Sequence, residues 1–362
     1  MKIAHVTNHF QPCLGGIERV VLEMSRHLLA RGHEVGVICL DRCAYSDEKL
    51  PARAEAEGIR IERIPFIDLK YYKIAPAVLE KIREFDIVHV HGVGFFSDFL
   101  SMTKAIHGKP VIVTTYGGGF HTSDIGFLKK AYFGLFERLA LGLADKVIAV
   151  NEEDEKRFGK ITGNVTRLDL GVDIERFRSA RKIPNSFIYV GRFSKNKRVE
   201  RLLEVFSKLK GEKATLIIAG NDWEGLMEEY LKKNIALGID GIVKYVKDPT
   251  DEELRELYGA AEFFVSASEF ESFGVSLVEA MASGCVPIVQ ENEGFRHILG
   301  DSECGIALDF SDAASAAQTI LKASGWGAMR KRHLGKMAIG RAHDFSWGEK
   351  IGQLEKIYGG AK

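Results

Sequence analysis

The sequence predicts an α/β protein built from two doubly wound, Rossmann-like domains that face a central cleft. At 362 residues the chain is longer than one hydrophobic core usually serves, so two domains are expected. Short apolar runs alternate with longer stretches of helical periodicity, which predicts βαβ units and parallel sheets. The alternation stops once, at the polar stretch 178–185, and then restarts. We therefore expect a first domain over residues 1–182 and a second over residues 183–344.

The expected elements follow this alternation in both halves. A helix over residues 17–30 separates the first two strands, and a last helix over residues 345–358 has its apolar residues at helical spacing. Ligands of open α/β sheets bind beyond the carboxyl ends of the strands, so the chemistry is expected in the loops that follow them. The main predicted strands are Ile3–Thr7, Glu34–Leu40, Asp86–His91, Val111–Thr114, Lys146–Val150, Phe187–Val190, Thr215–Ala219, Ile242–Val246, Phe263–Ser266 and Val286–Val289.

Composition excludes some classes of function. The 50 basic and 50 acidic residues cancel, so the chain lacks the basic excess of a nucleic-acid binder. The five cysteines are scattered and form no C-x-x-C pair, which predicts reduced, mostly buried thiols. The N-terminus shows no signal peptide, and no apolar run has the length of a membrane span. We expect a cytoplasmic protein.

The segment 266–284 is the strongest functional signal. It follows a predicted strand and opens a helix, so that Glu271 lies in the loop and Glu279 lies about one turn into the helix. Unpaired amides at the helix start, from Phe273 through Gly274 and Val275 to Ser276, suit a diphosphate. A carboxylate one turn further can accept hydrogen bonds from ribose hydroxyls. An amphipathic helix with two surface glutamates would also fit the pattern.

Two glycine-containing loops add candidate phosphate contacts. Arg192 and Lys197 follow Gly191 in the loop after the first strand of the second half, where two fixed cations can neutralise a leaving diphosphate. A solvated helix start would explain the same cations. In the first half, Gly15 and Gly16 would let backbone amides approach a phosphate. They do not form G-x-G-x-x-G, which disfavours a nicotinamide or flavin site.

The segment E-S-F-G-V-S-L-V-E-A-M-A-S-G-C-V-P-I-V resembles the signature of the family 4 glycosyltransferases. Their G-R-x-x-x-x-K and G-G-x-E patterns are also matched, the second by Gly15, Gly16 and Glu18. The resemblance implies the GT-B fold, with a final helix over residues 345–362 that crosses back to the first domain. It further implies a retaining hexosyl transfer from a nucleoside diphosphate sugar, with Glu279 on the ribose and Glu271 near the donor sugar.

The sequence does not decide which of two residues of the first domain faces the donor sugar. Members of the family usually carry a histidine soon after the strand 111–114, and Tyr116 occupies that position here. His121 follows a glycine run five residues later and is our first choice, although an ordinary structural histidine would fit as well. His89 and His91 share one face of a strand and could suggest a metal pair. The similar strand in the family holds no metal, so we favour a structural role.

The predicted function is therefore a metal-independent transferase. Arg192 and Lys197 would supply electrostatic stabilisation, and the chain contains no Asp-x-Asp for a divalent ion. No cofactor is expected besides the donor substrate. The sequence does not decide whether the acceptor is a glycan, a lipid-linked glycan or a small molecule. The mixed apolar and basic helix pattern of residues 127–143 fits contact with the inner face of a membrane, but it also fits a core helix.

Two other classes of function remain as alternatives. A sugar-nucleotide epimerase of the same fold would need no acceptor, and a non-catalytic subunit would bind nucleotide sugars without turnover. The loop after strand 286–289 differs from the family pattern, because it carries Glu293, Gly294 and His297 where a Gly-Gly and an acidic residue are usual. That loop is expected to have a modified role.

Overall fold

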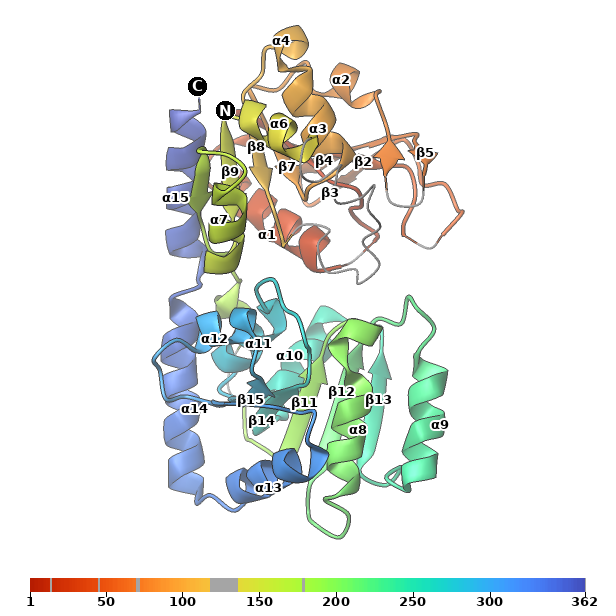
Figure 1. The fold of residues 1–362 in the computed structure, drawn as a ribbon, viewed down its shortest axis with the longest axis vertical. Helices are drawn as coiled ribbons and strands as arrows, with labels where there is room; N and C mark the ends of the chain where they lie inside the picture. The colour runs from red at the N-terminus through yellow and green to blue at the C-terminus, as the bar shows by residue number, and fades with distance from the viewer. Residues whose placement is uncertain (14, 45, 70–71, 118–135, 178–179, 362) are drawn as a thin grey trace. The chain divides into compact units, whose positions relative to one another are not determined.

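The chain folds into two compact α/β units, which confirms the predicted fold class. The first unit comprises Met1–Gly171 together with Trp347–Lys362, and the second comprises Val172–Ser346. Figure 1 shows the helices and strands of each unit, coloured from the N-terminus to the C-terminus. The computed structural model describes residues 1–13, 15–44, 46–69, 72–117, 136–177 and 180–361.

The first unit is built on an eight-stranded sheet with the order β10-β9-β8-β7-β1-β2-β4-β3. Every pair in it is parallel except β3 with β4. The strand order reverses between β1 and β7, so the loops after these two strands meet at a switch point. The strands are β1 (Lys2–Val6), β2 (Glu34–Leu40), β3 (Arg53–Ala56), β4 (Ile59–Ile64), β7 (Ile87–His91), β8 (Val111–Thr114), β9 (Lys146–Ala149) and β10 (Val165–Arg167), beside a small hairpin of β5 (Ile67–Asp68) and β6 (Lys73–Ile74).

The two faces of this sheet bury different partners, because side chains alternate along each strand. Ala4 and Val6 of β1 join an apolar core with Phe96 and Leu141 from α3 and α6. His5, between them, faces the opposite side, where α1 and α15 pack together. The helices are α1 (Gly16–Ala30), α2 (Val78–Lys81), α3 (Phe95–Met102), α4 (Lys104–His107), α6 (Glu137–Leu143), α7 (Glu152–Gly159) and α15 (Trp347–Gly360).

The last helix, α15, packs into the first unit as the resemblance implied. Its first residue, Trp347, lies on the backbone of Gly171, where any Cβ atom would overlap the indole ring. At its other end the Arg31 guanidinium donates two hydrogen bonds to Glu355, at 2.7 and 2.8 Å. Leu354 and Tyr358 of the same helix are fully buried. The apolar stripe read from the sequence therefore covers the first unit.

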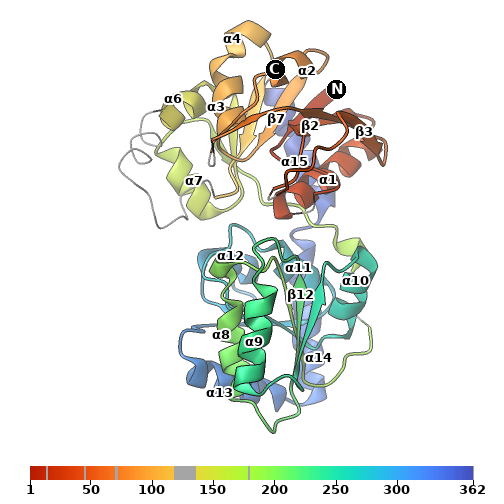
Figure 2. The ribbon, with the colours of Figure 1, turned by 90° about the vertical axis from the view of Figure 1, so that its right-hand side faces the viewer.

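The second unit contains a fully parallel six-stranded sheet with the order β13-β12-β11-β14-β15-β16. Helices α8, α9 and α13 lie on one side of it, while α10, α11 and α14 lie on the other (Figure 2). The strands are β11 (Ser186–Val190), β12 (Thr215–Gly220), β13 (Val243–Lys247), β14 (Phe263–Ser266), β15 (Val286–Gln290) and β16 (Ile306–Leu308). The helices are η3 (Ile174–Arg176), η4 (Lys195–Lys197), α8 (Val199–Ser207), α9 (Met227–Leu237), α10 (Asp251–Ala260), α11 (Val275–Ala282), α12 (Glu293–Leu299), α13 (Ala313–Ser324) and α14 (Ala328–His343).

The second unit begins earlier than the expected boundary at residue 182. The Ala180 and Ile183 amides donate to carbonyls at the end of α10, at 3.3 and 2.8 Å. The Lys182 ammonium donates to the Tyr258 and Ser283 carbonyls, at 3.1 and 2.7 Å. The polar stretch 178–185 was used to place the boundary between the domains, but Ala180, Lys182 and Ile183 within it are hydrogen-bonded to the second unit.

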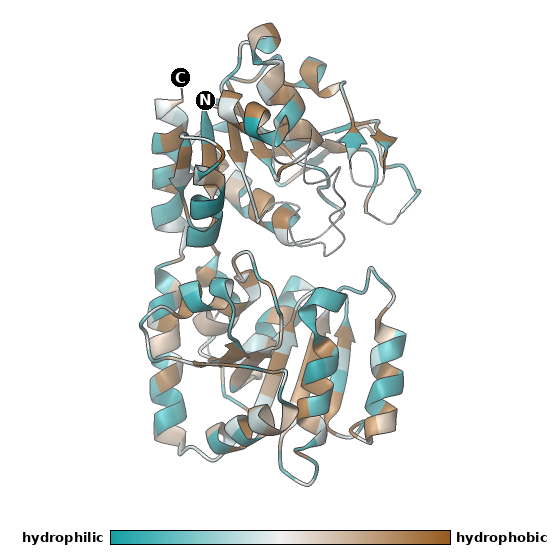
Figure 3. Cartoon of the chain, in the orientation of Figure 1, coloured by the Kyte–Doolittle hydropathy of each residue, from teal (hydrophilic) through white to brown (hydrophobic). Residues whose placement is uncertain are grey.

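Hydropathy follows the layers of each unit. In Figure 3 the strands are mainly brown, while the outer faces of the helices are mainly teal. Phe187 and Phe263 stack in the core of the second unit with ring centroids 4.8 Å apart. None of the helices in the described parts of the chain is both long enough and apolar enough to cross a lipid bilayer.

The prediction that all five cysteines are reduced thiols is wrong. Cys13 and Cys43 form a disulfide, whereas Cys39, Cys285 and Cys304 are free and buried. Cys13 follows β1 and Cys43 follows β2, and these strands are parallel neighbours. The carboxyl ends of parallel neighbours meet at one edge of a sheet, so strand order brings the pair together without any local spacing signal.

Candidate functional site

Two of the predicted catalytic residues meet at the switch point of the second unit. Lys197 lies in the loop after β11, and Glu271 lies in the loop after the neighbouring strand β14. The Lys197 ammonium donates to Oε1 of Glu271 at 2.6 Å, and the two side chains are only 18% and 14% exposed. Because an ammonium has three N–H donors, this ion pair leaves donors that can bind a phosphate oxygen.

Arg192 lies in the same loop as Lys197 but is exposed. Its guanidinium carbon is 5.7 Å from the centre of the Trp223 ring, and its carbonyl accepts a hydrogen bond from the Tyr189 hydroxyl at 3.3 Å. Burial raises the pKa of Tyr189 well above its ordinary value, and the Glu271 charge raises it further. The Arg192 charge acts on the same phenol in the opposite direction, so both charges lie near Tyr189.

Close backbone packing explains the glycine before Arg192. A Cβ atom on Gly191 would lie 2.7 Å from the Tyr189 hydroxyl oxygen. Gly220, at the end of β12, has a φ of 154°, and a Cβ there would overlap the Gly191 carbonyl oxygen. The loop that carries the two cations is therefore fixed by its own backbone against the neighbouring strand.

The start of α11 presents the predicted phosphate-binding amides. Gly274 caps this helix with a φ of 102°, a conformation that side chains disfavour. Phe273 is buried and packs edge-to-face on Phe345, with ring centroids 5.5 Å apart. Val275 and Ser276 are the first helical residues, and N–H groups at this position have no partner within the helix. The amides therefore lie at the positive end of α11, in the same unit as Arg192, Lys197 and Glu271.

Glu279 is held deeper in the same helix. It is 5% exposed, and the Tyr258 hydroxyl of α10 donates to its Oε2 at 3.1 Å. A carboxylate oriented in this way can accept hydrogen bonds from vicinal hydroxyls with its second oxygen. The sequence did not identify Tyr258, because an aromatic residue at helical spacing has the pattern of an ordinary core residue.

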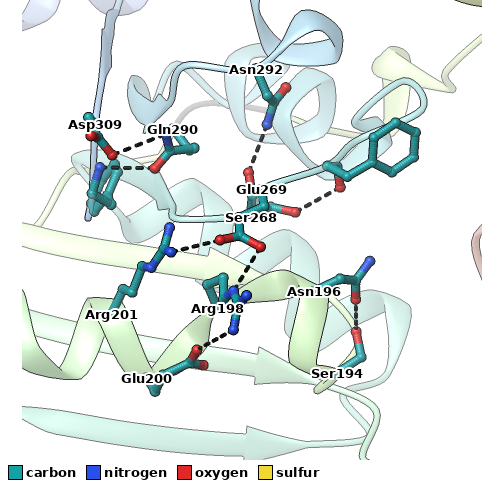
Figure 4. Close-up of polar contacts among 12 residues, drawn as sticks. Ser194, Asn196, Arg198, Glu200, Arg201, Ser268, Glu269, Gln290, Asn292 and Asp309 are labelled. Atoms are coloured by element: carbon teal, nitrogen blue, oxygen red, sulfur yellow. Dashed lines mark hydrogen bonds and ion pairs between the residues drawn. The ribbon is translucent and has the colours of Figure 1, made fainter. Parts of the chain in front are cut away.

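Neighbouring loops hold the Glu271 loop on both sides (Figure 4). The Asn292 amide donates to the Ser268 carbonyl at 2.8 Å. Glu269 accepts from Arg201 at 2.7 Å and forms an ion pair with Arg198 at 2.9 Å. A Cβ atom on Gly294 would overlap the Glu271 carbonyl oxygen. Gly294 was expected in a loop after β15, but it lies in the first turn of α12. There it packs directly on the backbone of Glu271.

The first unit carries the remaining predicted site residues. Gly15 caps α1 with an extended backbone, and a Cβ atom on Gly16 would have no atom of the described residues within 4 Å. Glu18 lies in the first turn of α1, and the Cys13 disulfide anchors the residues that precede it. His121 lies outside the described residues, as do residues 127–135 of the predicted apolar and basic helix.

Tyr116 lies at the start of the loop after β8, in an uncommon conformation. Its φ of 48° is left-handed, although it is not a glycine. Its hydroxyl oxygen is 2.9 Å from Nδ1 of His91. On either side of it, the Thr115 hydroxyl and the Gly117 amide each donate to Oδ2 of Asp154 at 2.7 Å. The sequence did not identify Asp154, which lies on α7.

The histidines read from the sequence belong to a buried group of three. His5 joins His89 and His91, and ligand atoms of the three lie within 4.8 Å of one another. Burial lowers the pKa of His5 to about 3 and holds the pKa of the other two well below their ordinary value. All three rings are therefore neutral.

Hydrogen bonds engage five of the six ring nitrogens in this group. His5 and His91 contact each other at 2.9 Å. His89 contacts the Tyr358 hydroxyl at 2.8 Å through Nδ1 and the Thr114 hydroxyl at 2.7 Å through Nε2. The ring nitrogens are thus used for hydrogen bonding, and the structural role of His89 and His91 stays a prediction.

The comparisons with known proteins cover both units. Residues 14–176 match the family described as Glycosyltransferase Family 4, and residues 172–333 match the family described as Glycosyl transferases group 1. Among solved structures, sucrose-phosphate synthase from Thermosynechococcus elongatus superposes with a TM-score of 0.81 at 20% identity, over 99% of this chain and 98% of that one. This likeness concerns the fold alone, and it confirms the GT-B fold.

Relatives at the sequence level are glycosyltransferases. The GDP-mannose:cellobiosyl-diphosphopolyprenol alpha-mannosyltransferase of Xanthomonas oryzae pv. oryzae is 35% identical over 330 residues, covering 88% of this chain and 86% of that protein. The phosphatidyl-myo-inositol mannosyltransferase of Mycolicibacterium smegmatis is 23% identical over 380 residues, covering 99% and 93%. The two family matches cover both units, and the Xanthomonas relative is similar along most of the chain. The protein is therefore a glycosyltransferase and belongs to glycosyltransferase family 4.

Proposed function

We propose that this enzyme transfers mannose from GDP-mannose to a diphosphopolyprenol-linked oligosaccharide, with retention of configuration and without a metal ion. The observation that carries the proposal is the Lys197–Glu271 ion pair beside the start of α11. It places a cation, a carboxylate and helix amides at one switch point, which is the set that a sugar diphosphate needs. The 35% identical relative is named for this donor and for an acceptor of this class.

Each residue has a separate task in the proposed reaction. Arg192, Lys197 and the amides of Val275 and Ser276 bind the diphosphate and stabilise the charge that develops on it as the bond to the sugar breaks. Glu279 accepts hydrogen bonds from the ribose hydroxyls, and Glu271 orients the sugar. The Gly15–Gly16 turn of the first unit offers backbone amides to an acceptor.

The proposed reaction needs no nucleophile from the protein. The bond between the anomeric carbon and the diphosphate oxygen breaks, and an acceptor hydroxyl oxygen forms the new bond on the same face. The departing diphosphate takes the proton of that hydroxyl. The products are the nucleoside diphosphate and a glycoside of retained configuration, so catalysis is electrostatic and depends on Arg192 and Lys197.

The decisive experiment follows both products of the transfer. The purified chain is incubated with GDP-mannose and a short-chain diphosphopolyprenol-linked disaccharide, with UDP- and ADP-sugars as comparison donors and with or without EDTA. We expect GDP release only when acceptor is present, a product heavier by one hexose, an α-anomeric NMR signal, and no effect of EDTA. Isomerised donor without acceptor would indicate an epimerase. Binding without transfer to any acceptor would indicate a non-catalytic subunit.

A membrane contact would suit a lipid-linked acceptor. Helices α4 and α6 both pack against α3, and their exposed side chains include Ile106 at 78% and Leu139 at 56% exposure. The cations Lys109 and Arg138 lie close to them in the sequence. We propose that this surface rests on anionic lipid. Flotation with anionic and with neutral vesicles tests it, since Ile106→Ser and Leu139→Ser should each reduce binding to the anionic vesicles only.

A further inference from the structure

A second contact joins the two loops that carry Lys197 and Glu271. Glu269 lies two residues before Glu271. Its backbone amide donates to the carbonyl of Asn196, the residue before Lys197, at 3.2 Å. A backbone hydrogen bond therefore connects the same two loops as the 2.6 Å ion pair between Lys197 and Glu271. The position of each loop depends on the other, since both contacts take one member from each loop.

The side chain of Glu269 extends this connection to the start of α8. Its Oε1 accepts a hydrogen bond from Arg201 at 2.7 Å, and its Oε2 forms an ion pair with Nε of Arg198 at 2.9 Å (Figure 4). The Glu200 carboxylate is further from Arg198, at 3.5 Å. Because Arg198 directly follows Lys197 in the chain, Glu269 holds the residue beside the catalytic cation.

Arg198 has a backbone conformation that needs such support. Its φ of 50° and ψ of 40° lie in the left-handed region, although it is not a glycine. This region is unfavourable for residues with a Cβ atom, and a residue stays in it only where surrounding contacts impose it. The ion pair with Glu269 fixes the side chain of Arg198 and is one such contact.

The conformation of Arg198 determines where Lys197 lies. Arg198 is the single residue between η4, which ends at Lys197, and α8, which begins at Val199. Helix α8 is anchored by Val199, Leu202 and Phe206 in the core of the second unit, and β11, before the turn, is an interior strand of the sheet. Since strand and helix are both fixed, a change of φ at Arg198 must be taken up by the turn that carries Lys197.

We infer that Glu269 is a positioning residue for the Lys197–Glu271 ion pair, because it holds Arg198 in the left-handed conformation that places the Lys197 ammonium beside Glu271. This inference rests on the proposed function for its effect on turnover. The side chains of Arg198 and Glu269 are 38% and 41% exposed, and ion pairs at such exposure contribute little to the stability of a fold. The contact therefore acts on the geometry of the loop and hardly on the stability of the unit.

The first test compares two substitutions at position 198. Arg198→Ala removes the guanidinium but keeps a Cβ atom, so the left-handed backbone loses its support and kcat should fall about tenfold. Arg198→Gly removes the guanidinium as well, but glycine adopts this backbone without steric cost. It should therefore turn over several times faster than Arg198→Ala. Equal turnover of the two variants would overturn the inference, because the backbone conformation at this position would then not matter.

Glu269→Gln should also lower kcat about tenfold, and its combination with Arg198→Gly should restore most of the loss. Glu204→Gln is the matched control. Glu204 is a similarly exposed carboxylate at 46%, and it pairs with Lys233 at 2.5 Å between α8 and α9, not between the two loops of the site. The control should keep kcat within about twofold of the wild type, and neither carboxylate variant should change the melting temperature much. An equal loss of kcat in Glu269→Gln and Glu204→Gln would refute a specific role of Glu269.

Hydrogen exchange tests the positioning role without any turnover. The amides to follow are those of residue 269 and of Lys197, which donates to the Ser194 carbonyl at 3.0 Å. Both should exchange about tenfold faster in Glu269→Gln and at the wild-type rate in Glu204→Gln, because local opening sets the rate. Unchanged exchange in Glu269→Gln would overturn the inference even if the wild-type chain transfers sugar. If the wild type transfers no sugar at all, the proposed function fails, while hydrogen exchange still decides the positioning role.

Discussion

The Lys197 ammonium and the Glu271 carboxylate form a 2.6 Å ion pair between loops 74 residues apart. Each group was predicted to act separately, the cation on the diphosphate and the carboxylate on the sugar. Their contact means that each fixes the position of the other. Arg192 is exposed, and no carboxylate of the described residues forms an ion pair with it.

Lys197→Ala should lower kcat by about two orders of magnitude, comparable to removal of a donor from an oxyanion site. Lys197→Arg should recover part of this loss because it keeps the charge. Steady-state kinetics with saturating donor measures both effects. Glu271→Gln is informative beside them, since it frees the ammonium and should tighten GDP binding while it slows transfer. Unchanged turnover in both Lys197→Ala and Arg192→Ala would refute the electrostatic mechanism.

Gly294→Ala should impair the enzyme although residue 294 has no chemistry of its own. The new methyl group would overlap the Glu271 carbonyl oxygen, so the Glu271 loop must shift. We expect a loss of about 1–3 kcal/mol in the free energy of unfolding, the usual cost of overpacking, and a lower kcat. Gly241→Ala is the control, since a Cβ atom there has no atom of the described part of the chain within 4 Å. Urea denaturation and kinetics on both variants would show whether the effect belongs to position 294.

Reduction of the Cys13–Cys43 disulfide should destabilise the first unit. The bridge spans 30 residues, and closing a loop of this length stabilises a fold by about 3.5 kcal/mol through the entropy of the unfolded chain. Thermal unfolding with and without a dithiol reductant measures the loss. The Cys13→Ser/Cys43→Ser variant should already be less stable and should not respond to the reductant. Five titratable thiols in the unfolded, unreduced protein would show that the bridge does not form.

Glu137 should make the first unit less stable at high pH. It is fully buried, and neither carboxylate oxygen has a hydrogen-bond partner among the described residues. Burial, and then the nearby Asp98 charge, raise the pKa of Glu137 from 4.5 to about 8. The folded state therefore holds a proton that the unfolded state releases. The resulting stability is complete below pH 4.5 and is lost as the pH rises towards 8.

Denaturation of the wild type and of Glu137→Gln across this range measures the effect. The wild type should lose up to about 1.4 kcal/mol per pH unit between the two pKa values. Glu137→Gln has no carboxyl to ionise and should lack this part of the slope, so it should be the more stable protein at pH 8. A wild type and variant with parallel profiles would mean that Glu137 titrates normally.

The sequence by itself determined the layered fold and most of the candidate site residues in the second unit. Apolar periodicity is a local property, so it revealed the strands and helices of both units before any contact was known. The segment around Glu271 and Glu279 could be read as a loop and a helix start for the same reason. The family pattern then pointed to Gly191, Arg192 and Lys197, because that pattern also lies within one short continuous segment.

Only the tertiary structure decided which distant side chains meet. Cys13 and Cys43 pair because β1 and β2 are neighbours, and His5 reaches His91 because β1 and β7 are neighbours. Tyr258 orients Glu279 across two helices. Strand order and the packing of helices on a sheet join segments tens of residues apart, and no local spacing encodes them. The sequence therefore identified the candidate groups of the site, and the packing decided how they are held.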